Sequence, residues 1–431
     1  MDLLRRVLRD ERGSMTLLSL YLLAGVLTIS AFAVDFAYLL AARNQLQIAA
    51  DAAAHAALYF RETHSADQAK IKAVELAQHS MPEEKYGAVL STQDIDFGRW
   101  DYASRTFTAD PYSVEAVRVR PGRTDARGNA VAAHLFRMID KPFWDLAAQA
   151  VFVTFDPHCF REGFVGEGVV DVQSNNGFEN GFCVHSNTYV SVNSNNTFEA
   201  GTVVSMPDST TVDLPRSGFV TNLGLQAALR NGYYRLRVLG QLDRIHDDLY
   251  LASGHFLPDY VSGSAPILLT GWKFGSADFI PGRVHRISCG GHDVQVDAGT
   301  TLSHVVIVTD CAIKFGQSVT LEDAVIFTRS TDDKSIYSAS SLQIGKNDNC
   351  VAGGGAQIIT YGGMVVPSDL RFYGGQVIAR GSVDFSANSG GIQGASIVAG
   401  GTISGTSNMS MGYCGTGMEN NFDVPYFRLA Y

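Results

Sequence analysis

The chain has 431 residues, a formal net charge of −10 and 46% hydrophobic residues. The acidic balance argues against nucleic-acid binding, because proteins that bind nucleic acids neutralise phosphates with Lys and Arg. The length is sufficient for two folded domains. The sequence therefore predicts separate domains and a partner other than nucleic acid.

Residues 15–34 form a run without formal charge. At about 1.5 Å per residue, a helix of this length spans about 30 Å, the thickness of the hydrocarbon core of a bilayer. The leader, residues 1–14, contains four arginines, which favour a cytoplasmic location for this end. A cleaved secretory signal is the alternative, but the run exceeds the usual apolar region of about 7–15 residues. We expect a single-pass anchor in the inner membrane of a bacterium, with the N-terminus cytoplasmic and the bulk in the periplasm or exposed in the cell envelope.

Residues 35–60 contain no Pro or Gly and are rich in good helix formers, so the membrane helix is predicted to continue outward as one stem. Four alanines at spacings of three and four share one face of this stem: Ala50, Ala53, Ala54 and Ala57. Small side chains allow another helix to approach closely. We interpret this face as a packing surface for a partner helix or for the following domain, rather than as a solvated stalk.

A second helix is predicted after Ser65, because Ser65 and Gln68 have capping-box spacing and small residues recur at helical intervals up to Pro82. Short extended segments follow, with a short helix expected at 129–139. The strands are expected at residues 95–99, 106–108, 114–120 and 147–155. Residues 35–157 are thus predicted to form a helical stem and a small, pilin-like α+β domain.

The sequence AVDFAYLLAARNQLQIAADAAAHAAL, preceded by ERGSM before the apolar run, resembles the N-terminal signature of TadE/TadG-like proteins of the Flp (Tad) pilus-assembly system. DFGRWDYASRTF and EAVRVR also resemble downstream segments of that family. The resemblance covers roughly residues 10–155. It implies a membrane-anchored component of pilus assembly or tight adherence, with other pilus-assembly membrane proteins as partners.

The chain departs from two patterns of related proteins. Pilins processed by prepilin peptidase commonly have Glu at the fifth position after the cleavage glycine, whereas Leu18 stands at that position counted from Gly13. A D-x-S-x-S metal motif, present in many TadG-like proteins, does not occur. Pilin-like processing and metal-dependent adhesion are therefore not expected.

From residue 158 the chain becomes rich in Gly, Ser, Thr and Asn, with short apolar segments repeated about every 20 residues. This period is typical of solenoids, whose turns bury their apolar sides by stacking. We predict a mostly β region at 158–431, in the form of a right-handed parallel β-helix, with a β-sandwich as the alternative. A helical insertion at about 223–253 is expected to cover an edge or end of the stacked strands.

All six cysteines lie beyond the anchor, at Cys159, Cys183, Cys289, Cys311, Cys350 and Cys414. An even number of cysteines in an exported chain indicates disulfides. Six cysteines allow fifteen full pairings, of which sequential pairing is our expectation because the first two gaps are short. The absence of C-x-x-C argues against a thioredoxin-like or zinc-ribbon site.

No catalytic constellation, cofactor site or metal site is recognisable in the sequence, which lacks G-x-S-x-G, H-E-x-x-H and P-loop motifs. Four aromatic residues are candidates for a sugar-stacking strip: Tyr361, Phe372, Tyr373 and Phe385. The sequence thus favours a non-enzymatic envelope scaffold or adhesion module that binds pilus-assembly proteins, with a glycan or cell-surface ligand second. The alternative is a membrane-tethered polysaccharide lyase or hydrolase, since β-helices often host such enzymes.

Overall fold

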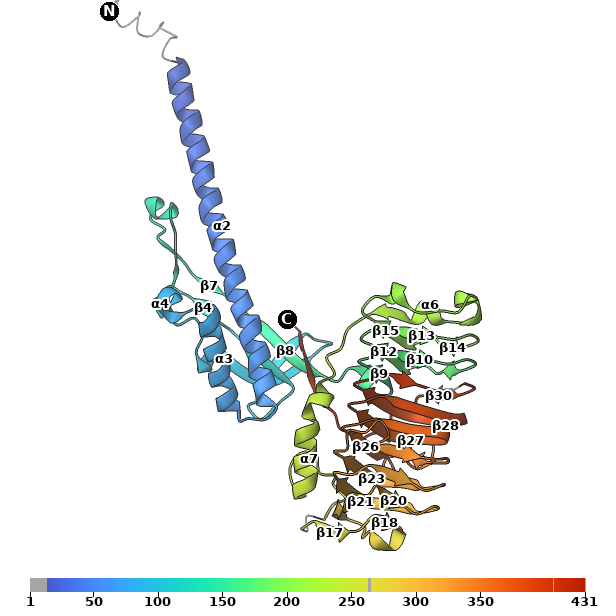
Figure 1. Ribbon diagram of the computed structural model, residues 1–431. Coiled ribbons are helices and arrows are strands. Elements are labelled where there is room, and N and C mark those ends of the chain that lie inside the picture. Colours follow the sequence, from blue (N-terminus) through green and yellow to red (C-terminus); the bar gives the residue numbers. More distant parts are fainter. Residues whose placement is uncertain (1–13, 263–264, 406, 431) are drawn as a thin grey trace, which may run out of the picture. The chain divides into compact units, whose positions relative to one another are not determined.

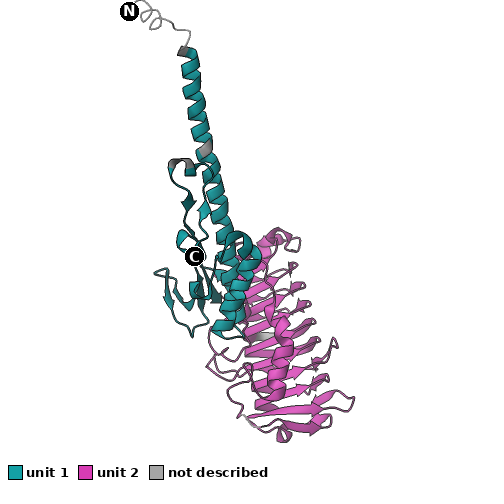
Figure 2. Cartoon of the chain, turned by 90° about the vertical axis from the view of Figure 1, so that its left-hand side faces the viewer, with its two compact units in different colours: residues 1–155, 425–431 teal, residues 156–424 magenta. Residues whose placement is uncertain are grey.

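The computed structural model describes residues 14–262, 265–405 and 407–430. The chain divides into two compact units (Figure 2): residues 1–155 with 425–431, and residues 156–424. The arginine-rich leader expected at 1–14 lies almost entirely outside the described residues. The second unit is mostly β, with parallel strand pairing.

The first unit begins with one continuous helix, α2 (Ser14–Arg61), as the absence of Pro and Gly after the apolar run predicted. Its length corresponds to about 70 Å. A second helix, α3 (Ala66–Ser80), begins at the predicted capping box, in which Ser65 and Gln68 bond each other's backbone N–H groups. The short helix α4 (Glu83–Tyr86) and the turn η2 (Thr92–Asp94) lead to the sheet.

The sheet of the first unit has the strand order β2-β1-β3-β8-β31 and is antiparallel throughout. Its strands are β1 (Ile95–Asp101), β2 (Thr106–Ala109), β3 (Ala116–Val119), β8 (Ala150–Phe155) and β31 (Tyr426–Leu429). The last of these corrects the expected boundary of the β region at 431. Because β31 pairs with β8, the end of the chain returns to the first unit.

A long hairpin separates β3 from β8, and the prediction of a helix at 129–139 is wrong. Its elements are β4 (Gly122–Arg123), η3 (Asp125–Arg127), β5 (Val131–Ala132), η4 (Phe136–Ile139), β6 (Phe143–Trp144) and β7 (Leu146–Ala147). Strand β4 pairs with β7, and β5 pairs with β6, so the helical part of residues 129–139 is limited to the 3₁₀ turn η4. An isolated helix of this length is marginal, and here strand pairing prevails.

The second unit is built from layers of about 20 residues that lie on one another in parallel register, and we call it the parallel stack. Its first strands are β9 (Gly163–Gly166), β10 (Val170–Val172), β11 (Gly177–Phe178), β12 (Cys183–Ser186), β13 (Val190–Val192), β14 (Thr197–Phe198), β15 (Val203–Met206) and β16 (Leu229–Asn231). Val170 lies beside Val190 and Cys183 beside Val203, which gives the predicted period.

The remaining layers come after a crossing segment. Their strands are β17 (Ile267–Thr270), β18 (Lys273–Phe274), β19 (Arg283–Ser288), β20 (Val294–Val296), β21 (Thr301–Thr309), β22 (Ile313–Phe315), β23 (Thr320–Thr328), β24 (Ile336–Ser338), β25 (Gln343–Ile344), β26 (Ala356–Thr360), β27 (Met364–Ala379), β28 (Val383–Ala399), β29 (Ile403–Ser404) and β30 (Ser410–Gly412).

The order of the layers differs from the order of the chain (Figure 1). The chain enters at β9 and builds outward through β12, β15 and β16. It then crosses to the opposite end and returns from β17, layer by layer, until β28 pairs with β9. The first and last layers are therefore neighbours in the interior of the stack, and both chain ends of this unit lie at that level.

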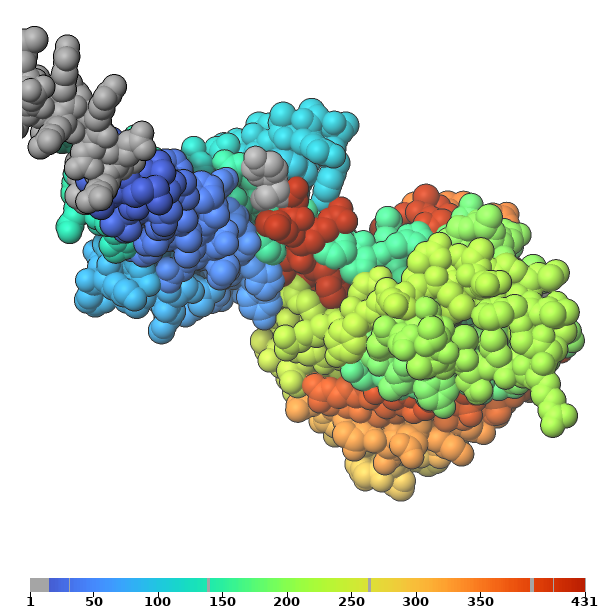
Figure 3. All heavy atoms as spheres, turned by 90° about the horizontal axis from the view of Figure 1, so that it is seen from above, coloured from blue at the N-terminus to red at the C-terminus, as the bar shows by residue number. Residues whose placement is uncertain are grey.

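The crossing segment corrects the predicted helical insertion at 223–253. Only part of it is helical: α6 (Leu225–Ala228), η7 (Arg237–Gln241) and α7 (Leu242–Leu251). The residues after β15, which include α6 and the turns η5 (Ser209–Thr211) and η6 (Gly218–Thr221), cover one end of the stack, as the yellow-green spheres show (Figure 3). In contrast, α7 contacts β19 and β21 along the side. Its buried face consists of Leu242, Ile245, His246 and Leu249.

Two features fill the interior of the parallel stack. Inward-facing Val, Ile, Leu and Phe side chains form one continuous core. At one corner, buried asparagines form a ladder, in which Asn196 Oδ1 accepts the backbone N–H of Asn176 at 2.8 Å. Asn222 Oδ1 likewise accepts from Asn196, and Asn176 Oδ1 accepts from Met409. The ladder thus crosses the junction between the first and last layers.

Candidate functional site

The predicted packing face of α2 is fully occupied within the first unit. Ala50, Ala53, Ala54 and Ala57 are each 0% exposed and share a core cluster with small residues of α3. The small side chains permit the close approach that the spacing indicated. This face therefore serves the chain's own second helix, and a partner helix would have to use another surface.

The apolar run of α2 is exposed along its described length. Leu17, Leu20 and Leu27, for example, are each at least 59% exposed. By length and composition, α2 is the one helix among the described residues that could cross a membrane. A long exposed apolar helix requires an apolar environment, so this surface is the first candidate for an interaction.

A single carboxylate marks the outer end of the run. Asp35 is only 3% exposed, and it accepts backbone N–H groups of His134, Leu135 and Phe136 at 3.0, 2.9 and 2.7 Å. Burial by itself would raise the pKa of Asp35, but the three hydrogen bonds outweigh it and hold the pKa below its ordinary value. Backbone N–H groups of residues 134–136, rather than water, therefore satisfy the negative charge of Asp35. The sequence placed this residue at the membrane boundary but could not show its partners.

The six cysteines form three disulfides in the order expected from their spacing, Cys159–Cys183, Cys289–Cys311 and Cys350–Cys414, with no free cysteine. The first joins α5 (His158–Arg161) to β12, and the second joins the segments that follow β19 and β21. The third links two loops far apart in sequence. In the chain-entropy description, bridges of these separations are worth about 3–4 kcal/mol each.

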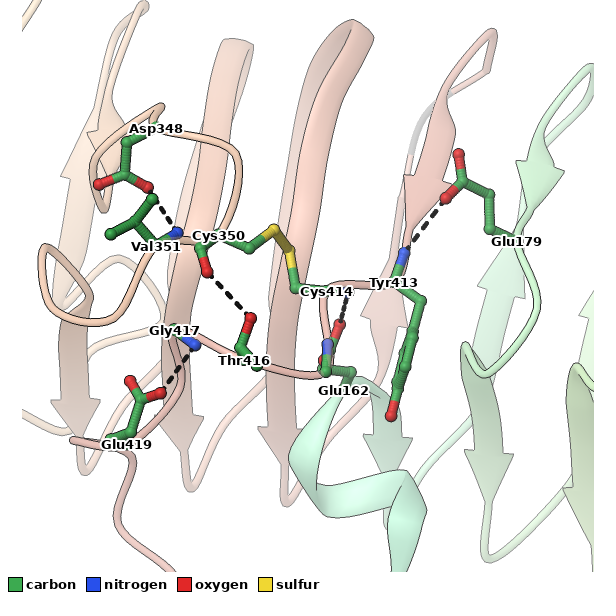
Figure 4. The surroundings of a disulfide bond; sticks show 11 residues. Glu162, Glu179, Asp348, Cys350, Val351, Tyr413, Cys414, Thr416, Gly417 and Glu419 are labelled. Atoms are coloured by element: carbon green, nitrogen blue, oxygen red, sulfur yellow. Dashed lines mark hydrogen bonds between the residues drawn. A yellow bond between two sulfur atoms is a disulfide. The ribbon is translucent and has the colours of Figure 1, made fainter.

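Figure 4 shows how the third disulfide belongs to a larger connection between the two ends of the stack's chain. Glu162, just before β9, accepts the backbone N–H of Cys414 at 2.6 Å and that of Gly415. The Thr416 hydroxyl donates to the Cys350 carbonyl at 3.0 Å. Glu162 is 1% exposed, and this burial raises its pKa in spite of the two hydrogen bonds. These contacts fasten the first layer to the last.

A recess of about 300 Å³ lies in the second unit between residues 255–259 and 419–423. Its carboxylates include Asp259, Glu419 and Asp423. Burial, with repulsion from Asp156 second, raises the pKa of Asp423 to about 6. Among the described residues, no group of three or more His, Cys, Asp or Glu side chains could hold a metal ion. The recess therefore offers negative charge but no recognisable catalytic pair.

Two of the four candidates for an aromatic strip are closed to a ligand, and only Tyr361 and Tyr373 are partly exposed. Phe372 and Phe385 are buried in the core of the stack. Tyr361 instead belongs to a contact that holds α7: its hydroxyl donates to Asp243, and the Arg380 guanidinium lies 4.0 Å from its ring centre. Burial, with the Asp243 hydrogen bond second, raises the pKa of Tyr361 to about 12. Tyr361 thus stabilises the crossing segment.

Histidines of the second unit also have local partners. His185 is fully buried between the Ser205 hydroxyl, at 2.7 Å, and the Asn187 side chain, at 2.9 Å. Burial lowers the pKa of His185, which keeps the ring neutral. These contacts provide hydrogen bonds between layers. The Ser205 hydroxyl is a potential nucleophile, but Ser205 is only 3% exposed and is buried together with the ring, so the pair is closed to a substrate.

The fold and these surfaces define a class of protein: a chain with one exposed, apolar, membrane-length helix, followed by a large disulfide-braced body with parallel strands. Residues 163–415 match the family described as a domain of unknown function (DUF7867), and residues 13–69 match the putative Flp pilus-assembly TadE/G-like family. The former match covers more than half of the sequence, so the chain belongs to the DUF7867 family. No curated protein matches it.

The N-terminal match and the helix agree with each other. The TadE/G-like segment contains the apolar run and the alanine-rich part of α2. Together they indicate a single-pass membrane protein that takes part in Flp pilus assembly.

Proposed function

We propose that this protein is a non-enzymatic scaffold or adhesion module of the Tad/Flp pilus machinery, anchored in the inner membrane. The N-terminus lies in the cytoplasm, and both units lie on the periplasmic or envelope side. The three disulfides support this placement, because such bonds persist in oxidising compartments. The TadE/G-like segment supports the assignment to pilus assembly.

The parallel stack is, in this proposal, a right-handed β-helix that acts as a stiff binding surface. A solenoid presents many layers at fixed spacing, so it suits recognition over an extended area. Its partners are other pilus-assembly proteins, with a glycan or cell-surface ligand second. The aromatic side chains Phe372 and Phe385 are unavailable to a sugar because the core covers them.

The observation that carries the proposal is the path of the chain through the stack. In a simple solenoid the chain enters at one end of the stack and leaves at the other. Here the chain enters at β9 and leaves after β28, and these two strands pair with each other in the interior of the stack. The segments that lead in and out continue as β8 and β31, which pair with each other in the first unit. Load on the stack is thus shared by two hydrogen-bonded strands, which is suited to a structural component.

The same pairing provides the test. Phe155 and Tyr426 are direct partners, so residues 156–425 can be replaced by a two-residue Asn-Gly turn that joins β8 to β31. We expect the shortened protein to remain in the membrane. We also expect pilus-assembly proteins to co-purify with the full chain, through the stack, but not with the shortened protein. Circular dichroism and protease resistance of the remaining unit serve as the folding control. Equal recovery of those partners by both forms would contradict a role for the stack.

The enzymatic alternative has its own measurement. The full chain in detergent is incubated with a panel of bacterial polysaccharides, and chain length is followed by size-exclusion chromatography. The scaffold proposal predicts no depolymerisation. Depolymerisation that is lost on a single Asp substitution in the stack would overturn it.

A further inference from the structure

We propose that the hairpin tip, residues 133–144, is a second membrane contact that lies in the outer interface of the bilayer that α2 spans. The proposal rests on the membrane anchoring of α2 described above. It concerns a different part of the chain, one that neither family match includes. The partner of the hairpin tip is the lipid of that bilayer.

The tip is fixed beside the end of the apolar run. Asp35, the first residue after the run, accepts the three backbone N–H groups at the start of η4. Phe136 meets Phe32, inside the run, with ring centres 4.9 Å apart, and His134 meets Tyr38 at 4.7 Å. At 1.5 Å per residue, Phe32 lies about 3 Å inside the end of the run. The hairpin tip therefore lies at the level where hydrocarbon gives way to headgroups.

The composition of the tip suits this level. Phe143 is 51% exposed and Leu135 is 37% exposed, so two large apolar side chains of the tip face outward. Trp144 packs against Phe136, and the Lys141 ammonium lies 4.8 Å from the Trp144 ring centre. Aromatic rings with neighbouring cations are typical of membrane interfaces, where the rings lie among headgroups and the cations meet phosphates.

The contact also explains how α2 tolerates a charge at this depth. Phe36, Tyr38 and Leu40 beyond Asp35 are at least 40% exposed, so the apolar surface continues past the carboxylate. A carboxylate that faces lipid is unfavourable because it loses its contact with water. Here Asp35 is covered by the hairpin tip, whose N–H groups satisfy it. The tip and the helix thus present one continuous surface to the membrane.

The test places a reporter on the tip and a matched one elsewhere in the same unit. Phe143→Trp and Tyr112→Trp each convert an exposed aromatic residue, so neither disturbs the core. Tyr112 lies beside Arg61, at the opposite end of α2 from the apolar run. Both full-length variants and the unaltered protein are placed in lipid nanodiscs made with phospholipid brominated close to the headgroup, and the added tryptophan emission is compared.

Phe143→Trp is expected to lose most of its added emission to the brominated lipid and to resist aqueous iodide. Tyr112→Trp is expected to show the reverse. If the added emission of Phe143→Trp responds to iodide as strongly as that of Tyr112→Trp and is unaffected by bromine, the hairpin tip does not contact the membrane. Co-elution of protein with nanodiscs reports on the anchor separately, and failure to co-elute would contradict both the anchor and this inference.

Discussion

The junction between the first and last layers of the parallel stack depends on buried asparagines, and Asn176→Ala tests it most sharply. Asn176 is 2% exposed. Its Oδ1 accepts the Met409 backbone N–H at 2.9 Å, and its Nδ2 donates to the Gln173 carbonyl at 2.8 Å. Alanine leaves both backbone groups without these partners.

The expected loss of stability follows from these two backbone groups. Each buried polar group that loses its partner costs about 1–3 kcal/mol, so two groups predict a loss of about 2–6 kcal/mol. Asn196→Ala removes the equivalent bonds one layer away, to the Asn176 N–H and the Asn193 carbonyl, and should cost a similar amount. Thr197→Ala, at an exposed position on β14, is the control and should stay within about 0.5 kcal/mol.

The assay is urea unfolding of the full chain in detergent, combined with hydrogen exchange resolved by peptide. Asn176→Ala should increase exchange selectively in β11 and β30, which pair across the junction. Asn196→Ala should instead increase it in β11 and β14. If Asn176→Ala changes neither stability nor exchange beyond the Thr197→Ala control, the ladder does not hold the junction, and our account of the topology is wrong.

Three further perturbations have defined outcomes. Ala53→Leu should destabilise the first unit by about 1–3 kcal/mol through overpacking against α3, measured by thermal unfolding, whereas Ile48→Leu at an exposed position should have little effect. Replacing both Cys350 and Cys414 by Ser should cost about 4 kcal/mol in urea, because their 64-residue separation closes a long loop, and an unchanged midpoint would refute this. Because burial raises the pKa of Asp423 to about 6 from 3.8, its contribution is complete below pH 4 and is lost as pH rises through 6. Asp423→Asn should therefore gain stability over the unaltered protein above pH 6, by about 1 kcal/mol at most because the residue is exposed to solvent. A gain confined to acid pH would show the opposite sign.

The elements governed by local pattern were predictable from the sequence. The apolar run, the Ser65–Gln68 capping box and the 20-residue period depend on spacing alone, and the structure contains all three. The paired Asn residues at 175–176 and 195–196 also carried a readable signal, since the first of each pair adopts a positive φ and the second enters the ladder. The Asn pairs alone do not predict the ladder, because one repeated motif does not show which layers are neighbours.

The parts that failed depend on contacts between distant segments. Nothing near β9 in the sequence indicates that it pairs with β28, so the return of the chain to the middle of the stack could not be inferred. The same topology explains why β31 leaves the stack and joins β8. The segment at 129–139 has helical composition, but Asp35 and strand pairing limit it to one turn. A local pattern cannot reveal a partner a hundred residues away.

The central claim is that the parallel stack lies on the oxidising side of the membrane that α2 crosses. The direct measurement is labelling of spheroplasts with a membrane-impermeant thiol reagent, with and without prior reduction, followed by peptide mapping. We predict that the six cysteines are labelled only after reduction, without lysis of the cells. Labelling before reduction would show free thiols in place of the disulfides, and labelling that requires lysis would place the stack in the cytoplasm. Either result would contradict the account.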